Sequence, residues 1–259
     1  MIATPPSGYV SPEYLQRMAV IAQTIKQASH QRMNIQSGDC VLDVGCGPGV
    51  DTLPLAKWVG PQGKVFGIDS DVEMISIANA KAREQGLEKS VEHRTGSADN
   101  LPFDDGFFAS CHAERLLQVL PPSLARPVIQ ELKRVTQAQG RVVLADADWG
   151  SFSINSRDAA LERTLVQFFA ERLRPNGYAG RQIFTLMREC GFSHIDIDVH
   201  PLVHNTLAAI PLEWLYKEAC KQTIAPPCAL KLWWEDIQAH CKAGTFFCTV
   251  NMIVVTGTV

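Results

Sequence analysis

The segment VLDVGCGPGV at residues 41–50 constrains the fold more than any other part of the sequence. An apolar run, Val41 to Val44, leads into the glycines Gly45, Gly47 and Gly49. Such a run ending in closely spaced glycines is typical of a buried parallel strand that enters a tight nucleotide-binding turn. The segment therefore predicts an α/β fold, and it leaves open whether the ligand is NAD, ATP or S-adenosylmethionine (SAM).

Strand-like and helix-like segments alternate from this turn to residue 148. The expected strands are 40–45, 65–69, 91–95, 107–112 and 141–146, and the expected helices between them are 51–59, 71–85 and 122–137. This alternation predicts a doubly wound, mostly parallel sheet with helices on both faces.

The rest of the chain is expected to extend this core. Helices are predicted at 11–30, 157–173 and 180–190 and through most of 211–242, and strands at 194–203 and 246–256. The first of these two strands alternates as Ile195, Ile197 and Val199, so we expect that face to be buried. The final strand is expected to run antiparallel, which completes a seven-stranded sheet. We predict one domain over 1–259, with an N-terminal helical cap (1–37), a nucleotide-binding core (38–150) and a helical insertion (205–243).

Composition excludes several classes of protein. The net charge of −3 gives no general attraction to nucleic acid or to an anionic membrane. No apolar stretch approaches the roughly 20 residues that span a bilayer, and the first residues do not resemble a secretory signal. The eight cysteines form no CxxC pair, which favours reduced thiols in a cytoplasmic protein. His194, His200 and His204 lack ligand-like spacing, so no metal is expected.

The residues around the turn distinguish the three nucleotides. No lysine follows the glycines, as a phosphate-binding loop for ATP would require, and the spacing is GxGxG rather than the GxGxxG of dinucleotide sites. Asp43 precedes the glycines, and a carboxylate there suits an ammonium and opposes a diphosphate. Asp69 ends the second strand, near the spacing at which an acid meets a ribose diol. Together these residues favour SAM, which carries an ammonium and a sulfonium but no phosphate.

Several segments resemble one known family. VLDVGCGPGVDT, VFGIDSD (65–71), GSADNLPFDDGFF (96–108) and RVVLADADWG (141–150) are similar to class I SAM-dependent methyltransferases. The closer likeness is to the small-molecule branch typified by ubiquinone and menaquinone biosynthesis, and it covers roughly residues 38–200. The resemblance implies a Rossmann-like methyltransferase fold, SAM as cofactor and a small-molecule acceptor.

The resemblance also implies which residues line the cofactor. Asp43 would reach the ammonium of SAM, directly or through water, and Asp69 would hold the ribose hydroxyls. Ser70 has an equally good interpretation as a helix cap. The other implied contacts are Gly45, Cys46 and Gly47 at the methionine part, Met74 at the adenine face, Ser70, Ser97, Ala98 and Asp99 at the adenine edge, and Cys111 with His112 at the transferable methyl.

Methyl transfer from a sulfonium needs mainly alignment, and a general base only when the acceptor holds its proton tightly. His112 and Asp148 are the predicted catalytic residues; the alternatives are a pocket wall for His112 and a turn cap for Asp148. Many relatives have His where this chain has Val119, so no base is carried over. An aromatic group in the second half has two interpretations, core or acceptor chamber: Trp214, Tyr216, Trp233, Trp234, Phe246 and Phe247.

We therefore expect an enzyme that methylates oxygen or carbon of a small, fairly apolar molecule. Two alternatives stay open: a methyltransferase of nucleic acid or protein, and a SAM-binding protein without catalytic activity. The expected partners are the small-molecule acceptor and, as an option, a second copy of the chain in a homodimer. Neither nucleic acid nor a membrane span is expected.

Overall fold

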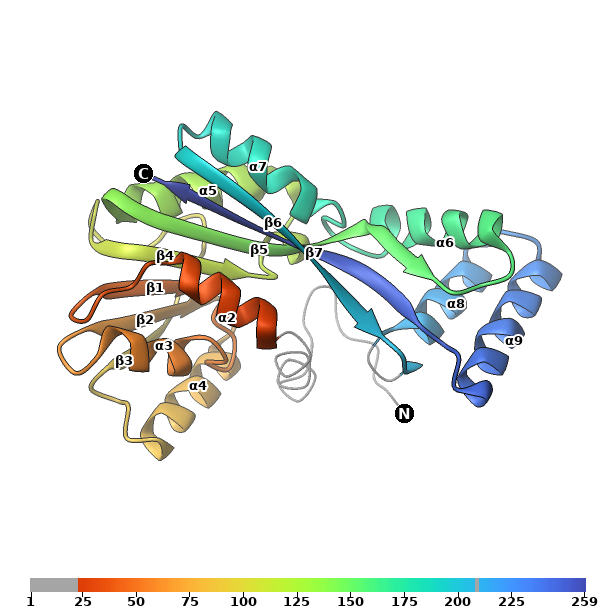
Figure 1. Cartoon of the computed structure of the whole chain (residues 1–259), viewed down its shortest axis with the longest axis horizontal. Helices are drawn as coiled ribbons and strands as arrows, with labels where there is room; N and C mark the ends of the chain where they lie inside the picture. The colour runs from red at the N-terminus through yellow and green to blue at the C-terminus, as the bar shows by residue number, and fades with distance from the viewer. Residues whose placement is uncertain (1–22, 208–209) are drawn as a thin grey trace.

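A computed structural model describes residues 23–207 and 210–259 (Figure 1). Within that part, the N-terminal helix predicted at 11–30 is represented by α2 (Gln23–Arg32). The earlier portion of that prediction, and of the predicted cap 1–37, lies outside the described residues.

Seven strands form one sheet in the order β3-β2-β1-β4-β5-β7-β6. The first five strands pair in parallel, and β7 runs antiparallel to both β5 and β6. The strand bounds are β1 Cys40–Val44, β2 Lys64–Asp69, β3 Val91–Thr95, β4 Phe108–Glu114, β5 Thr136–Ile154, β6 Ser193–His204 and β7 Cys248–Thr258. The predicted seven-stranded, mostly parallel α/β sheet is confirmed.

Helices cover both faces of this sheet (Figure 1). On one face lie α2, α3 (Thr52–Val59) and α4 (Val72–Glu84), and on the other lie α5 (Pro122–Val135) and α7 (Ala179–Glu189). A short 3-10 helix, η1 (Leu117–Val119), follows β4. The remaining helices, α6 (Ala159–Arg172), α8 (Leu212–Lys221) and α9 (Pro227–Ala243), gather around the far ends of the longest strands (Figure 1). The helices predicted between the last two strands are therefore present as α8 and α9.

The fifth strand is much longer than predicted. The sequence indicated 141–146, whereas β5 contains 19 residues, Thr136–Ile154. Its pairing with β7 shifts register between Asp148 and Ser153, and both strands continue past that irregularity. Figure 1 shows β5, β6 and β7 extending from the nucleotide-binding core to the group formed by α6, α8 and α9. The pairing of β6 with β7, which is unbroken from Asp196 to His204, therefore connects the core to this second helical group.

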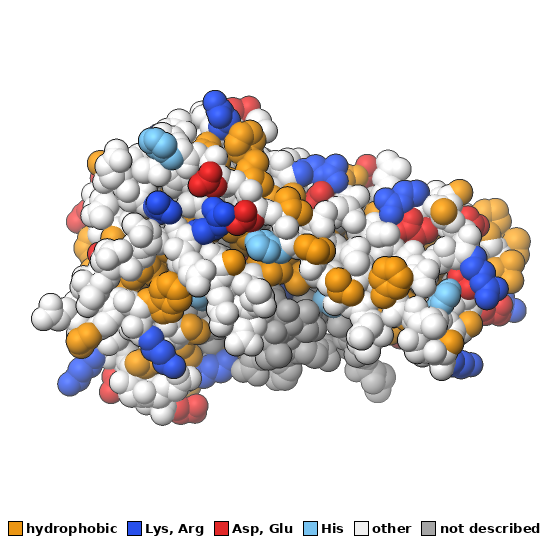
Figure 2. Space-filling model, viewed as in Figure 1, with side chains coloured by type: hydrophobic (Ala, Val, Ile, Leu, Met, Phe, Trp, Pro, Cys, Tyr) orange, Lys and Arg blue, Asp and Glu red, His pale blue; other side chains and the backbone are white. Residues whose placement is uncertain are grey.

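The predicted buried face of the sixth strand is wrong for Ile197 and Val199, whereas Ile195 is partly buried against the core. Ile197 and Val199 are exposed at 45% and 53%, and the buried side chains of β6 are Leu202 and His204. The alternation itself is correct, but β6 is an edge strand of the sheet. The aspartates on its other face, Asp196 and Asp198, lie toward Arg32 on α2, which forms an ion pair with Asp198. Hydrophobic side chains are accordingly visible at the surface in Figure 2, along the path that β6 follows in Figure 1.

Helix α7 approaches the backbone of β5 so closely that only glycine fits at Gly180. A Cβ there would lie 2.6 Å from the carbonyl oxygen of Asp146 and 3.0 Å from the carbonyl carbon of Ala147. In an unconstrained helix, Gly→Ala stabilises by up to about 1 kcal/mol. We expect Gly180→Ala instead to destabilise by about 1–3 kcal/mol, because α7 must move off the sheet.

Denaturant unfolding of Gly180→Ala and of Gln182→Ala tests this prediction. Gln182 is exposed on the same helix, so its substitution should change stability by less than about 0.5 kcal/mol. A Gly180→Ala protein as stable as the parent would contradict the steric argument.

Candidate cofactor-binding site

The loop between β1 and α3 has a backbone that only glycine adopts readily. Gly45 and Gly47 have φ angles of +76° and +50°, which are strained for residues with a Cβ. The amides of Gly45 and Cys46 both donate to the carbonyl oxygen of Ile68 at the end of β2 (2.7 and 3.0 Å). The Gly47 amide donates to Asp69 Oδ2 (2.8 Å). The loop is thus tied to β2 by its own N–H groups.

This use of the amides determines what charge the site favours. A phosphate-binding loop directs unpaired N–H donors at its ligand. Here the amides of Gly45, Cys46 and Gly47 are already bonded within the protein, and carboxylates lie at both edges of the loop, Asp43 on β1 and Asp69 on β2. The arrangement disfavours a diphosphate and favours a ligand that carries positive charge and hydroxyl donors.

Asp69 is held in a defined orientation at the end of β2. One oxygen accepts the Gly47 amide and the other accepts the Asp71 amide (2.9 Å). Burial raises the pKa of Asp69, while backbone hydrogen bonds from Asp71, Gly47 and Ser70 act in the opposite direction. A carboxylate has about four lone-pair positions, more than the backbone amides use here, so acceptor capacity remains for the hydroxyls of a diol.

The cap of the following helix differs from the prediction for Ser70. Asp71 is the N-cap of α4, and its side chain accepts the amides of Glu73 and Met74. Met74 lies in the first turn and is buried. The predicted adenine-side residues follow in the next loop, where Ser97 donates to Asp99 and Ala98 is half-buried. That loop is adjacent to the site, because the Gly96 amide donates to the carbonyl oxygen of Asp69 (3.0 Å).

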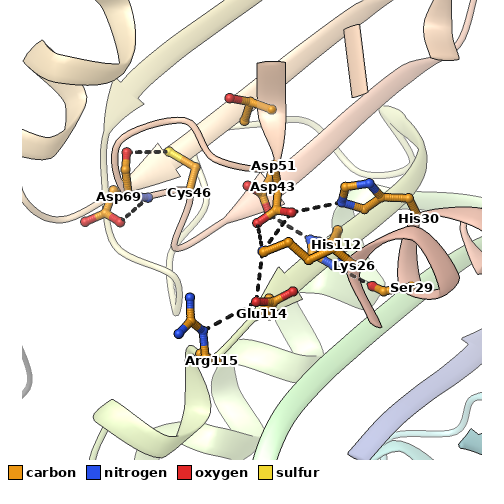
Figure 3. A network of polar contacts seen from close by, with 12 residues as sticks. Lys26, Ser29, His30, Asp43, Cys46, Asp51, Asp69, His112, Glu114 and Arg115 are labelled. Atoms are coloured by element: carbon orange, nitrogen blue, oxygen red, sulfur yellow. Dashed lines mark hydrogen bonds and ion pairs between the residues drawn. The ribbon is translucent and has the colours of Figure 1, made fainter. Parts of the chain in front are cut away.

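Helix α2 contributes charged residues that the sequence did not identify as part of the site. Lys26 Nζ lies 2.7 Å from Asp51 Oδ2 and 2.8 Å from Glu114 Oε1, and His30 Nε2 lies 3.0 Å from Asp51 Oδ1. All four side chains are buried. Figure 3 shows them converging beside Asp43 from α2, from the loop before α3 and from the end of β4. Because Lys26, Asp51 and Glu114 are all buried away from water, each charge depends on this pairing to offset the cost of its desolvation.

His112 lies inside this group rather than at the end of its strand. The sequence placed the end of the fourth strand at His112, but β4 continues to Glu114. The imidazole is fully buried, with Nδ1 2.9 Å from Asp43 Oδ1 and Nε2 2.7 Å from Ser29 Oγ. Burial lowers the pKa of His112, but Asp43, Asp51 and Glu114 together raise it above its usual value. Both ring nitrogens are engaged, so the contacts do not support His112 as a proton acceptor for a substrate.

The other oxygen of Asp43 is the notable open position. Asp43 Oδ2 is buried and has no hydrogen-bond partner among the described residues. Burial raises the pKa of Asp43, and the hydrogen bond from His112 opposes this effect. A buried carboxylate oxygen without a donor is costly, so this atom marks a position where a ligand can supply one.

The predicted common orientation of Cys111 and His112 is wrong. Successive residues of a strand point to opposite faces of the sheet. Cys111 therefore lies on the α5 side, where Thr136 Oγ1 donates to its Sγ (3.0 Å), and burial raises the pKa of the thiol to about 12. The Cys46 side chain points toward Gly67 on β2. Its contribution to the cofactor site would therefore come from its backbone. Neither thiol is in a reactive environment.

The predicted catalytic role of Asp148 conflicts with its contacts. Its two carboxylate oxygens accept hydrogen bonds from Arg181 Nε and Nη2, both at 2.8 Å, in a bidentate pair. Its neighbour Asp146 accepts the amide of Leu117 (2.7 Å) and so orients η1, while burial raises the pKa of Asp146 to about 7. Both acids therefore hold the segments around the carboxyl ends of β4 and β5, Asp146 through η1 and Asp148 through Arg181.

The aromatic side chains beyond β5 form a packed junction. Trp149 donates to Gln118 Oε1 (2.6 Å), and its ring lies 5.0 Å from that of Phe169 and 4.5 Å from the guanidinium of Arg174. In the second helical group, Trp233 and Phe246 are buried, Tyr216 stacks on Trp234, Trp214 meets Phe169 edge to face, and Phe247 is exposed. The core interpretation therefore describes most of these residues.

One group of side chains in the described part of the chain has the composition of a metal site. Asp43, Asp51 and His112 carry possible metal-ligand atoms within 4.8 Å of one another, but Lys26 and His30 already contact the Asp51 carboxylate. We therefore assign no metal to this group. Within 23–207 and 210–259, no helix has the length and apolarity required to span a membrane.

Comparison with known proteins gives a consistent result. Residues 41–140 match the family model of a methyltransferase domain. Over 249 residues the chain is 31% identical to an uncharacterized 37.1 kDa protein in transposon TN4556 of Streptomyces fradiae, covering 93% of this chain and 69% of that protein. It is 36% identical over 112 residues to demethylmenaquinone methyltransferase of Lactobacillus johnsonii, covering 43% of this chain and 45% of that protein. The matched segment spans about half the length of such demethylmenaquinone methyltransferases.

The fold also has solved counterparts. The structure of a geranyl diphosphate methyltransferase in complex with SAM is similar with a TM-score of 0.59 and 17% sequence identity. The superposition covers 95% of this chain and 88% of that one. At this identity the likeness concerns the fold.

The buried ammonium of Lys26 on α2 leads to a prediction about the stability of this site. Lys26→Met keeps most of the side-chain volume but leaves Asp51 and Glu114 as buried acids without their ammonium. We expect a loss of about 3–5 kcal/mol in the free energy of unfolding. Denaturant titration should also show partial recovery in Lys26→Met/Glu114→Gln, because one of the two buried carboxylates that lost the ammonium is then neutral.

Lys57→Met is the matched control, since Lys57 is exposed on the neighbouring helix α3. Its substitution should change stability by less than about 0.5 kcal/mol. Equal effects of the two lysine substitutions would contradict the assigned role of Lys26.

Proposed function

This chain belongs to the class I SAM-dependent methyltransferases, and we propose that it transfers the methyl group of SAM to an oxygen or carbon atom of a small apolar or aromatic molecule. The choice of SAM as the ligand rests on the hydrogen bonding of the β1–α3 loop. Its amides are bonded internally, and carboxylates flank it. SAM matches that environment because it bears positive charge and a ribose diol and lacks phosphate.

We propose the following placement of the cofactor. The ammonium of SAM is received by Asp43 Oδ2, the buried oxygen that lacks a donor. The ribose hydroxyls would bind Asp69 at the acceptor positions that its backbone hydrogen bonds leave free. The methionine part follows the backbone of Gly45, Cys46 and Gly47. The adenine lies between Met74 and the segment Ser97, Ala98 and Asp99, with Ser70 beside it.

The acceptor is proposed to bind beyond the carboxyl ends of β4 and β5, where ligands of open α/β sheets collect. Leu116 supplies an apolar surface there, with Cδ1 3.0 Å from the position that a Cβ on Gly45 would take. The named acceptors of the relative and of the solved structure, demethylmenaquinone and geranyl diphosphate, are small molecules and support the same class here.

The mechanism proposed is in-line displacement at the methyl carbon. The sulfonium is an activated leaving group, so catalysis by this chain consists mainly of alignment and exclusion of water. No side chain is assigned as general base, because His112 and Asp148 already have all of their candidate atoms in contacts with other residues. An acceptor that is acidic enough to ionise, or an activated carbon nucleophile, fits such a site best.

Asp69→Ala tests the cofactor assignment. It removes charge-assisted hydrogen bonds to the ribose, so SAM affinity should fall roughly 10- to 100-fold. Isothermal titration calorimetry measures the change, and thermal unfolding controls for the loss of the loop contacts. Asp104→Ala, at an exposed acid of the loop before β4, should leave affinity unchanged. An unaltered dissociation constant for Asp69→Ala would show that the ribose binds elsewhere, and tighter binding of NAD than of SAM would overturn the choice of cofactor.

A second experiment addresses the acceptor. Methyl-labelled SAM is incubated with the protein and a panel of quinols, phenols, polyketides and sterols. Label is expected in an organic product, at oxygen or carbon. Labelling of nucleic acid or protein instead would favour the macromolecular alternative. Tight SAM binding without any product would favour a SAM-binding protein that lacks catalysis.

A further inference from the structure

A chain of three buried side chains connects helix α2 to the first strand. Ser29 Oγ lies 2.7 Å from His112 Nε2, and His112 Nδ1 lies 2.9 Å from Asp43 Oδ1. Figure 3 shows the three side chains together. Ser29 and His112 are fully buried, and Asp43 is 2% exposed. The order of groups is that of a Ser-His-Asp triad, but the hydroxyl is enclosed by protein and cannot meet a substrate. Any effect of the Ser29 hydroxyl on the site must therefore reach Asp43 through the imidazole of His112.

Asp43 has two oxygens with different surroundings. Oδ1 contacts His112, whereas Oδ2 is buried without a hydrogen-bond partner among the described residues. The His112 ring determines how the carboxylate plane is turned, because it anchors one oxygen and leaves the other to face a ligand. The ring can hold this orientation only while its second nitrogen also has a partner, and Ser29 supplies that partner.

We propose that Ser29 is a positioning residue for the cofactor's amino-acid moiety: through His112 it orients Asp43 so that Oδ2 meets the ammonium. This inference rests on the proposed placement of the ammonium at Asp43. Helix α2 then takes part in cofactor binding without contacting the cofactor. Loss of the hydroxyl leaves His112 Nε2 buried without its partner, so the ring rotates and Asp43 loses its fixed orientation.

Two ligands separate this role from a merely structural one. S-adenosylhomocysteine carries the amino-acid ammonium, whereas 5′-methylthioadenosine keeps the adenosine and the thioether but lacks the amino acid. Ser29→Ala should weaken S-adenosylhomocysteine about tenfold and leave 5′-methylthioadenosine unchanged within about twofold, measured by calorimetry. Equal weakening of both ligands would mean a general structural role, and no weakening of either would also overturn the proposal.

Ser110→Ala is the matched control. Ser110 is buried two residues before His112 on the same strand, and its hydroxyl donates to the carbonyl oxygen of Arg141 (2.8 Å) rather than to the chain of three. It should change neither affinity. Ser29→Cys keeps a weaker hydrogen-bonding group and should show intermediate S-adenosylhomocysteine affinity with 5′-methylthioadenosine unchanged. This variant carries the test if Ser29→Ala does not fold, and equal loss of both ligands in it would overturn the proposal.

The parent protein provides the separate check on the premise. If it binds S-adenosylhomocysteine no more tightly than 5′-methylthioadenosine, the placement of the ammonium at Asp43 fails. If the parent prefers S-adenosylhomocysteine and Ser29→Ala keeps the full preference, that placement stands and only the role of Ser29 fails.

Discussion

The cofactor end of the structure depends on the ion pairs that Lys26 makes with Asp51 and Glu114. One ammonium joins α2 to the loop before α3 and to the end of β4. An acid left alone at this depth would be strongly destabilising, so the three elements are stable in this arrangement only together. Asp51 illustrates the constraint, because it is the N-cap residue of α3 and yet directs its carboxylate to α2 instead of to the helix amides.

The second constraint is the use of backbone donors around the glycines. Because the amides of Gly45, Cys46 and Gly47 hold the loop to β2 and Asp69, these three donors are not available to a phosphate. The same turn of chain that binds phosphate in other α/β proteins is thereby suited to a cationic nucleoside. Selectivity for the type of nucleotide follows from where the hydrogen bonds go, and the glycine spacing alone would not establish it.

How much could be predicted from the sequence follows from the range of the interactions. Strand β1, the glycine loop that follows it and the acids Asp43 and Asp69 belong to local sequence patterns. The fold and the residues beside the glycine loop could therefore be predicted. The contacts of α2 were not, because Lys26 and Asp51 are 25 residues apart, and Ser29 and His112 are 83 apart. Polar residues on a short helix are ordinarily solvated, and only the packing of α2 onto the sheet reveals them as buried. The error at Cys111 was avoidable, since strand alternation already separates it from His112.

The charges around Asp43 link these constraints to ligand binding. The carboxylates of Asp43, Asp51 and Glu114 lie close together, and Lys26 forms ion pairs with Asp51 and Glu114. Among the residues that the structure describes, the Asp43 side chain hydrogen-bonds to the imidazole of His112 through Oδ1, and its buried Oδ2 is available to a further positive charge. A bound ammonium there would satisfy an atom that the protein leaves without a donor, so ligand binding and packing of α2 should reinforce each other through shared carboxylates. Because anything that binds only the folded state stabilises it, the cofactor should act on the same contacts that hold this end of the fold together.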